Sequence, residues 1–391
     1  MCFVLLQAVA LASPRHIIPF EYKSGFIIVD VVIDGRLPVK FLFDTGSRLS
    51  VLTDNSLLAF LGRTPDDRIR IVGSDRTQLI EGRLLRRTSF EVGSLSMKSQ
   101  SLVVLDEDLL NLKELTGQNV YGILGVEAFG AYAVTIDYVA ERIILEKSAR
   151  LRKAKKVIEL PIELHESRAF LRVFTKVHEN YADTLQLLID SGASLDLMLS
   201  TSFSDTLMLP PQLVPGVIAT GLGGKVLGVV GRSDSIQLGP HKLQQLITHF
   251  QLVGDDAPYG SDNLDRDGLI GNNLLHRFVV TIDYPRSVLL LKPRRKFRAI
   301  TRFDRSGMQL IRGGPDLDKI IVQRVTPKSP ADLAGIQAGD VITRVGVLAT
   351  SLRGLEGTRR ALQGRINKSI KVHWSRQGEP LQASLTLQKL I

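Results

Sequence analysis

The chain has 391 residues, more than one hydrophobic core usually holds, so two or three domains are expected. Its composition, with 44% hydrophobic and 23% charged residues, excludes collagen-like, coiled-coil and wholly disordered proteins. A net charge of +10 over this length is a modest field and does not indicate a nucleic-acid partner. Because Cys2 is the only cysteine, an intramolecular disulfide and a cysteine-rich zinc site are both excluded.

The strongly apolar run CFVLLQAVALA lies at the start of the chain, from Cys2 to Ala12. It is too short to span a membrane, for which about 20 residues are needed. Its apolar character and the small-x-small pattern Ala10-Leu11-Ala12 are typical of a secretory signal, although no basic residue precedes it. We therefore expect a leader over residues 1–15 and export to the periplasm or the cell exterior. A buried N-terminal strand is the alternative.

The chain contains two copies of one domain, because three short blocks recur at the same offset of 146 positions. The blocks are FLFDTGSRLSVL at 41–52 against LLIDSGASLDLM at 187–198, GILG at 122–125 against GLIG at 268–271, and TIDY at 135–138 against TIDY at 281–284. Each copy is predicted to be mostly β, because short apolar or β-branched runs alternate with turn signals. The expected strands of the first copy include 26–33, 40–43, 102–105 and 142–145. Short helices are expected after each Asp motif and near 124–129 and 270–278, and the basic stretches 147–156 and 292–305 are interpreted as solvated linkers.

From about Thr301 the composition changes and no third copy of the repeat follows. A strand is predicted over 320–325, followed by a short helix that Ser329 caps and Gly335 ends. A turn at 339–340, a helix over 352–362 and strands over 371–374 and 383–387 complete the expected elements.

The residue types in the two Asp motifs suit a pair of carboxylates that face each other. In each motif an apolar strand holds the carboxylate, a hydroxyl residue can bond across an interface, and glycine permits a tight turn. Two such loops related by a pseudo-twofold axis would bring Asp44 and Asp190 face to face. Because neighbouring carboxylates cannot both ionise easily, the pair would share one proton. The ionised partner could then activate a water while the protonated partner bonds a substrate carbonyl, which is machinery for amide hydrolysis.

Over residues 20–298 the chain resembles a retropepsin-like aspartic protease of the two-lobed, single-chain kind. The resemblance rests on Asp44-Thr45-Gly46-Ser47, on Asp190-Ser191-Gly192-Ala193 and on the paired Gly-apolar-apolar-Gly blocks. It implies two homologous β-barrel lobes, catalytic Asp44 and Asp190, and active-site support from Thr45, Gly46, Ser191 and Gly192. It also implies a hairpin over the cleft in each lobe, with candidate flap residues Gly73, Ser74, Thr220 and Gly221. Ser191 departs from the commoner Thr, and the typical flap tyrosine of pepsin-like enzymes is missing, so flap chemistry and specificity stay open.

Residues 301–391 resemble a PDZ domain, a small α+β module. The resemblance rests on Ser329-Pro330-Ala331, Ala334-Gly335-Ile336 and Gly339-Asp340-Val341-Ile342. PDZ domains bind a peptide that adds as a strand, and backbone N–H groups of a small-residue loop hold its terminal carboxylate. The resemblance places these contacts at Gly307, Met308, Gln309 and Leu310, for peptide C-termini or internal strands. A PDZ domain that only packs on the protease is the alternative.

The sequence does not match the common motifs for calcium, phosphate or zinc binding, or for a serine hydrolase. The calcium-like run from Asn263 has Leu274 at its twelfth position, where a bidentate Glu is needed. Gly224-Lys225 lacks the rest of a phosphate loop, and His165-Glu166 does not continue into a zinc motif. No Gly-x-Ser-x-Gly elbow is present, so a serine hydrolase of the α/β kind is disfavoured. No metal and no cofactor is therefore expected.

The sequence predicts an aspartic-type endopeptidase that is competent as a monomer, acts on polypeptide substrates and has neither a nucleic-acid partner nor a stable membrane span. The expected domains are a leader at 1–15, protease lobes at 16–150 and 151–298, and a PDZ domain at 299–391. A non-catalytic peptide-binding protein that uses the cleft and the PDZ domain is the first alternative. A basic scaffold for nucleic acid, supported only by the two linker clusters, is the second.

Overall fold

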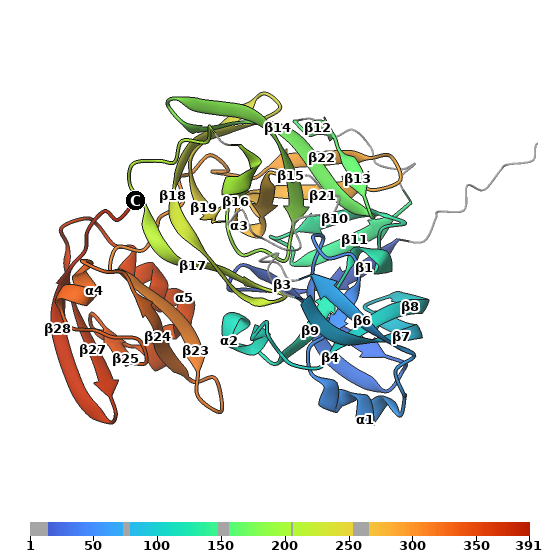
Figure 1. The fold of residues 1–391 in the computed structure, drawn as a ribbon, viewed down its shortest axis with the longest axis horizontal. Coiled ribbons are helices and arrows are strands. Elements are labelled where there is room, and N and C mark those ends of the chain that lie inside the picture. Colours follow the sequence, from blue (N-terminus) through green and yellow to red (C-terminus); the bar gives the residue numbers. More distant parts are fainter. Residues whose placement is uncertain (1–14, 73–78, 148–155, 205, 253–265) are drawn as a thin grey trace, which may run out of the picture.

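A computed structural model of the chain describes residues 15–72, 79–147, 156–204, 206–252 and 266–391. Two β-rich lobes lie against each other, and a third, smaller domain formed by the C-terminal residues lies beside the second lobe (Figure 1). The chain is mostly β, as predicted, and its few helices are short. Of the leader expected over 1–15, residues 1–14 lie outside the described residues.

The first lobe is built around an eight-stranded sheet in the order β2-β3-β4-β9-β5-β8-β7-β6. A further pairing between β3 and β7 closes this sheet on itself. Its strands are β2 (Glu21–Lys23), β3 (Phe26–Ile33), β4 (Leu37–Phe43), β5 (Ser50–Leu52), β6 (Asp67–Val72), β7 (Leu79–Val92), β8 (Leu95–Leu105) and β9 (Val120–Leu124).

The second lobe repeats this topology strand for strand, in the order β13-β14-β15-β20-β16-β19-β18-β17 with a closing pairing between β14 and β18. This equivalence confirms the duplication predicted from the sequence blocks. Its strands are β13 (Glu163–His165), β14 (Arg168–His178), β15 (Tyr181–Asp190), β16 (Leu197–Ser200), β17 (Val214–Gly221), β18 (Gly224–Leu238), β19 (His241–Gln251) and β20 (Gly268–Gly271).

A six-stranded sheet joins the two lobes, in the order β1-β11-β10-β21-β22-β12. Its two central strands pair antiparallel with Thr135 opposite Thr281, and the hydroxyls of these residues lie 2.8 Å apart. Since the two threonines are equivalent in the repeat, the pseudo-twofold axis passes between them. The strands are β1 (His16–Pro19), β10 (Ala133–Asp137), β11 (Arg142–Glu146), β12 (Ile158–Pro161), β21 (Phe278–Asp283) and β22 (Val288–Pro293).

One hydrophobic core runs through both lobes and this connecting sheet. Phe43 and Phe129 stack with their ring centroids 4.3 Å apart directly behind the first Asp motif. Because both rings are almost wholly buried, they fix the end of β4 from which Asp44 projects.

The helical segments of the lobes are single turns. They are η1 (Asn55–Leu57), α1 (Leu58–Leu61), α2 (Leu112–Thr116), η2 (Val126–Ala128), η4 (Thr201–Phe203) and α3 (Asn272–Leu275). The turns near 124–129 and 270–278 occur as predicted, whereas the helical turn after each Asp motif begins only after a further strand, β5 or β16. The second basic stretch is not a free linker, because Arg294 donates to the carbonyl of His276 and Thr301 to Asp196.

The C-terminal domain is a sheet in the order β23-β24-β25-β27-β28, with β26 paired to β25 and two helices packed on it. Its strands are β23 (Met308–Gly313), β24 (Lys319–Val325), β25 (Val341–Val345), β26 (Leu348–Ala349), β27 (Ser369–Arg376) and β28 (Glu379–Thr386), and its helices are α4 (Pro330–Leu333) and α5 (Thr350–Leu362). The predicted helix start is correct, because the Ser329 hydroxyl accepts the N–H of Asp332 at 3.4 Å.

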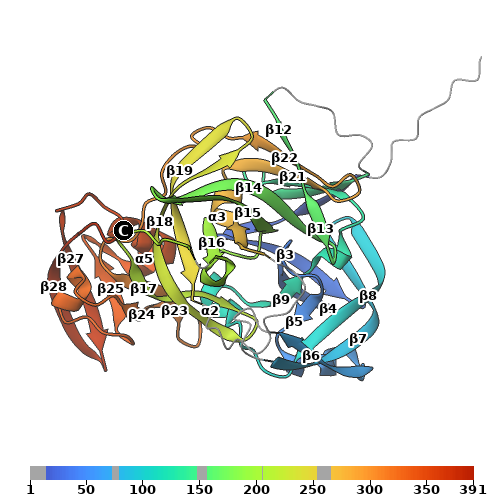
Figure 2. The same ribbon diagram turned by 45° about the horizontal axis from the view of Figure 1, so that its top comes forward.

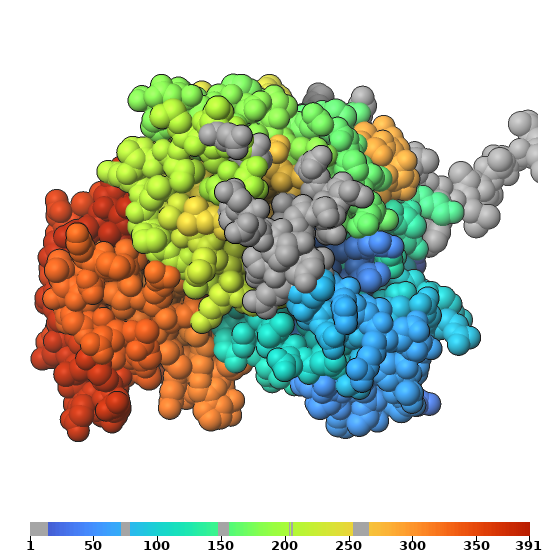
Figure 3. Space-filling view, in the orientation of Figure 1, coloured from blue at the N-terminus to red at the C-terminus, as the bar shows by residue number. Residues whose placement is uncertain are grey.

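The C-terminal domain packs against the second lobe, where its orange and red surface meets the yellow-green lobe (Figure 3). Ile391 is buried within an apolar cluster of that lobe which includes Ile218 and Val230. Arg232 of β18 donates to the carbonyl of Thr301 at 2.9 Å, close to the start of the domain. Within the described parts of the chain, no helix has the length and apolar character that crossing a membrane requires.

Candidate active site

Asp44 and Asp190 meet at the interface of the two lobes. Asp44 follows the buried end of β4, and Asp190 ends β15, whose last four residues pair in parallel with β20. Each carboxyl lies against the glycine of the opposite motif, so the two groups are close together, and neighbouring carboxyls of this kind share one proton. The structure therefore brings together the two aspartates that the sequence repeat singled out.

The hydroxyl residues after the two aspartates brace the site symmetrically. Thr45 Oγ1 donates to the carbonyl of Ile189 at 2.8 Å and accepts the N–H of Ser191 at 3.0 Å. In return, Ser191 Oγ donates to the carbonyl of Phe43 at 2.8 Å and accepts the N–H of Thr45 at 3.0 Å. Both side chains are almost fully buried, so these four bonds hold the two Asp loops in one geometry.

The two glycines that follow allow each loop to approach the opposite aspartate. A Cβ placed on Gly46 would lie only 2.6 Å from Cγ of Asp190, and one on Gly192 would collide with Cγ of Asp44. Their N–H groups also bind the carboxylates, since Gly46 donates to Asp44 at 2.7 Å and Gly192 to Asp190 at 2.8 Å. Glycine is therefore required at both positions, because any larger side chain would overlap the opposite carboxyl.

Burial raises the pKa of both carboxyls, and it raises that of Asp190 further because the charge of Asp44 adds to the effect. The N–H groups of Gly46 and Ser47, at 2.7 and 3.3 Å, oppose this rise at Asp44. The N–H of Gly192 donates to Asp190 and likewise lowers the pKa of that carboxyl. The pair titrates as a unit, and the larger number of N–H donors favours the negative charge on Asp44.

The brace gives a prediction for stability. Thr45→Val keeps the shape of the side chain but leaves the Ser191 N–H and the Ile189 carbonyl without their partner. Each unsatisfied buried group costs about 1–3 kcal/mol, so thermal or urea unfolding should show a clear loss of stability. Thr45→Ser retains the hydroxyl and serves as the control. A Thr45→Val protein as stable as Thr45→Ser would show that the cross-lobe bonds contribute little.

The aspartates open into a cavity of about 900 Å³ that both lobes and the C-terminal domain line. Part of its second-lobe wall is apolar and is formed by Leu195, Met198, Ile218, Ile247 and Leu269, with polar residues such as Arg168 and Asp196 beside it. The turned ribbon of Figure 2 shows β17 lying between the lobes and the C-terminal domain. An apolar patch next to two carboxyls can hold a hydrophobic group of a ligand.

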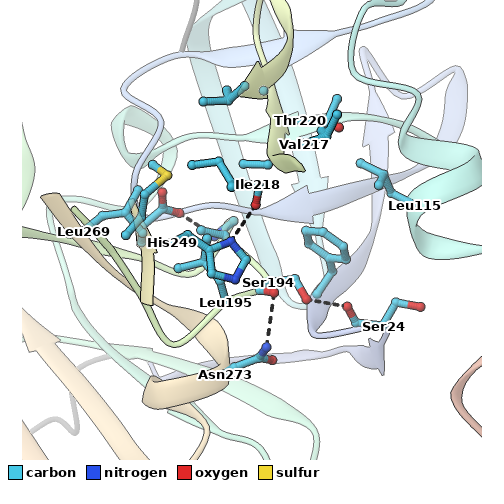
Figure 4. Close-up of a pocket in the computed structure, with 18 of the residues that line it drawn as sticks. Ser24, Leu115, Ser194, Leu195, Val217, Ile218, Thr220, His249, Leu269 and Asn273 are labelled. Atoms are coloured by element: carbon cyan, nitrogen blue, oxygen red, sulfur yellow. Dashed lines mark hydrogen bonds between the residues drawn. The ribbon is translucent and has the colours of Figure 1, made fainter. Parts of the chain in front are cut away.

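His249 of β19 is a cavity residue that no sequence pattern indicated. Its Nδ1 lies 2.6 Å from the carbonyl of Ile218 on β17, as the dashed line in Figure 4 shows. A carbonyl can only accept, so Nδ1 carries the proton, and burial lowers the pKa of this histidine. A neutral His249 therefore ties β17 to the sheet behind it. Figure 4 also shows a bond between the lobes, in which Ser194 Oγ donates to the carbonyl of Ser24 at 2.6 Å.

Two of the four candidate flap residues, Thr220 and Gly221, lie in the described part of the chain. Thr220 and Gly221 end β17 and line the cavity, and Gly221 pairs with Gly224 to close the β17–β18 hairpin. Gly73 and Ser74 lie outside the described residues, although β6 and β7 on either side of them form the equivalent hairpin.

The candidate peptide-binding residues of the C-terminal domain lie on the same cavity. Gly307 precedes β23 with a φ of 84°, a conformation that favours glycine, and Met308, Gln309 and Leu310 begin β23 itself. β23 is the end strand of its sheet in the described part of the domain. Neither the cavity nor any other region of the described residues holds a group of three or more His, Cys, Asp or Glu that could bind a metal.

The comparisons with known proteins agree with this architecture. Aspartyl protease sequences match residues 29–128 and again 176–274, a little over half of the chain, and a PDZ domain matches residues 321–376. The chain belongs to the aspartyl protease family, with two copies of the protease domain followed by a PDZ domain, as the sequence predicted. No curated protein shows a significant match to the chain.

Proposed function

We propose that the protein is an aspartic endopeptidase that hydrolyses peptide bonds in extended polypeptides. The observation that carries the proposal is the pair of partly buried carboxyls of Asp44 and Asp190, each packed against the glycine loop of the other, at the wall of a cavity of about 900 Å³. A purely structural pair of facing carboxyls would cost folding free energy, because burial disfavours their charge. The four-bond brace maintains this costly arrangement.

In the proposed reaction, the more ionised Asp44 takes a proton from a water held between the carboxyls. The protonated Asp190 bonds the substrate carbonyl and supplies its proton as the oxygen gains charge. The tetrahedral intermediate then collapses: one of its hydroxyls returns a proton to Asp190, the C–N bond breaks, and Asp44 gives the leaving nitrogen the proton that it took from the water. The pair again holds a single proton. Membership of the aspartyl protease family supports this assignment of roles.

Within this proposal the PDZ domain recruits or regulates polypeptide substrates. Its strand β23 lines the same cavity as the aspartates, which supports a direct part in substrate binding. Export, expected from the apolar start of the chain, remains part of the proposal.

A non-catalytic peptide-binding protein is the second candidate, because both the cleft and a PDZ domain accept strands. Incubation of wild-type protein with casein from pH 3 to pH 8, followed by mass spectrometry of the products, separates the two. New peptide ends that an Asp190→Asn protein does not produce support the endopeptidase. Casein binding without cleavage at any pH would favour the binding protein.

The dyad gives a prediction for the pH profile. Activity requires one proton on the pair, so it falls on the acid side when Asp44 gains a second proton and on the alkaline side when Asp190 loses its own. Since burial raises both pKa values above the usual carboxyl value of about 4, the whole bell in kcat/KM should be displaced upward. A profile whose alkaline limb has already fallen to little activity by pH 4 would contradict the displacement.

A further inference from the structure

The backbone N–H groups of the loop before β23 already donate hydrogen bonds to other groups of the protein. The Asp304 carboxylate accepts the N–H of Ser306 at 3.0 Å, the N–H of Gly307 at 2.5 Å and the hydroxyl of Ser306 at 2.8 Å. The N–H of Met308 in turn donates to Ser306 Oγ at 3.2 Å. Three successive backbone donors at the start of the PDZ groove therefore already have acceptors.

This arrangement disfavours the C-terminal carboxylate of a peptide. Such a group needs backbone N–H donors in this loop, and it would lie beside the charge of Asp304. Burial raises the pKa of Asp304 to about 6, which leaves its carboxylate ionised at pH 7.5. Two like charges in one partly buried loop repel each other, so a peptide without a terminal charge here is the better ligand.

The strand that follows still presents an edge to which an extended chain can add. β23 pairs with β24 on one side only, among the described strands. On its other side the carbonyl of Leu310 accepts a bond from Arg359 Nη2 of α5 at 2.7 Å. A long, partly exposed side chain is a displaceable partner, so an added strand could take over this carbonyl.

The edge of β23 faces the edge of another sheet across the catalytic cavity. β17 is the end strand of the second-lobe sheet, and residues of both strands line the one cavity. The side chain of Gln309 spans the gap, with Nε2 3.5 Å from the carbonyl of Val217. Asp44 and Asp190 lie in the wall of the same cavity.

We propose that β23 binds an internal, extended segment of the same polypeptide chain whose neighbouring segment occupies the catalytic cleft, and that it does not select C-terminal carboxylates. The ligand class is an unfolded chain long enough to reach both the dyad and β23. This inference rests on the proposed endopeptidase function. It assigns the PDZ domain a part in the substrate site itself.

The test blocks the β23 edge with a bulky label. In a Cys2→Ser background, Gln309→Cys is labelled with fluorescein maleimide. The matched control is Gln382→Cys with the same label, because Gln382 is also exposed but lies on β28, at the opposite edge of the same sheet. Substrates are full-length casein and eight-residue peptides that contain its cleavage sites.

Labelling at position 309 should raise KM for casein at least tenfold and raise KM for the eight-residue peptides by a clearly smaller factor. Labelling at position 382 should change neither. Equal casein KM values for the two labelled proteins would overturn the proposal.

A second arm tests the terminal carboxylate. Casein-derived twenty-residue peptides, made as free acids and as amides, compete with fluorescent casein for unlabelled Asp190→Asn protein at pH 7.5. Equal inhibition by acid and amide, within about twofold, is expected, whereas a tenfold preference for the acid would overturn the proposal.

The two proposals fail in different ways. If the wild-type protein cleaves nothing, the endopeptidase function fails. The inference on β23 is then still tested by measuring casein binding to the two labelled proteins. The protein labelled at 309 should bind casein at least tenfold more weakly than the protein labelled at 382.

Discussion

Asp190→Asn is expected to lower kcat/KM for casein by at least about 10³-fold, which corresponds to about 4 kcal/mol of transition-state stabilisation. Asn fits the space of Asp190 and can still donate a hydrogen bond to Asp44. Its amide proton, however, cannot be transferred to the substrate oxygen and regained in each turnover. Steady-state kinetics at the pH optimum of the wild type measures the loss. A variant that keeps more than a tenth of wild-type turnover would remove Asp190 from the catalytic role.

The stability of the same variant separates lost chemistry from lost structure. The pKa of Asp190 is raised in the folded protein, so its contribution to stability is present below the unfolded value of about 4 and is lost as pH rises through the folded value. Asn is uncharged at every pH and does not suffer this loss. Asp190→Asn should therefore be at least as stable as wild type at pH 7, by thermal unfolding. A large drop in Tm would mean that inactivity reflects misfolding.

The duplication and the dyad could be predicted because they depend on local patterns that recur at a fixed offset. Thr135 and Thr281 are equivalent positions in the repeat, and the structure pairs them directly across the connecting sheet. The same argument placed Asp44 opposite Asp190. Short apolar strands and the Ser329 helix cap were also predictable, because each depends on neighbouring residues alone.

The remaining parts of the site depend on packing between distant elements, which one sequence does not show. His249 enters the cavity because β17 folds over β19, and nothing near it in the sequence marks it. Asp304 lies in a stretch interpreted as a basic linker, yet it turns back to bind the N–H groups of Ser306 and Gly307. The contact of Gln309 with Val217 joins two domains that were predicted separately.

Gly192→Ala is expected to lower kcat/KM for casein by at least about 10²-fold, the second largest effect that we predict. The new methyl group would overlap the carboxyl of Asp44, so that side chain has to move away from its place beside Asp190. A displacement of this kind removes the geometry on which proton transfer depends. Gly192 has no left-handed backbone conformation, so steric overlap is the direct cause of the loss.

The control is Gly130→Ala, a crowded glycine away from the carboxyls. A Cβ at that position would lie 3.1 Å from the Val126 side chain, so it should lower Tm slightly and leave kcat near the wild-type value. The two variants together distinguish overlap with the dyad from crowding in general. Gly192→Ala with wild-type kcat would mean that the two carboxyls need not touch for activity. The shared proton, and with it the assignment of acid and base roles to Asp190 and Asp44, would then have to be abandoned.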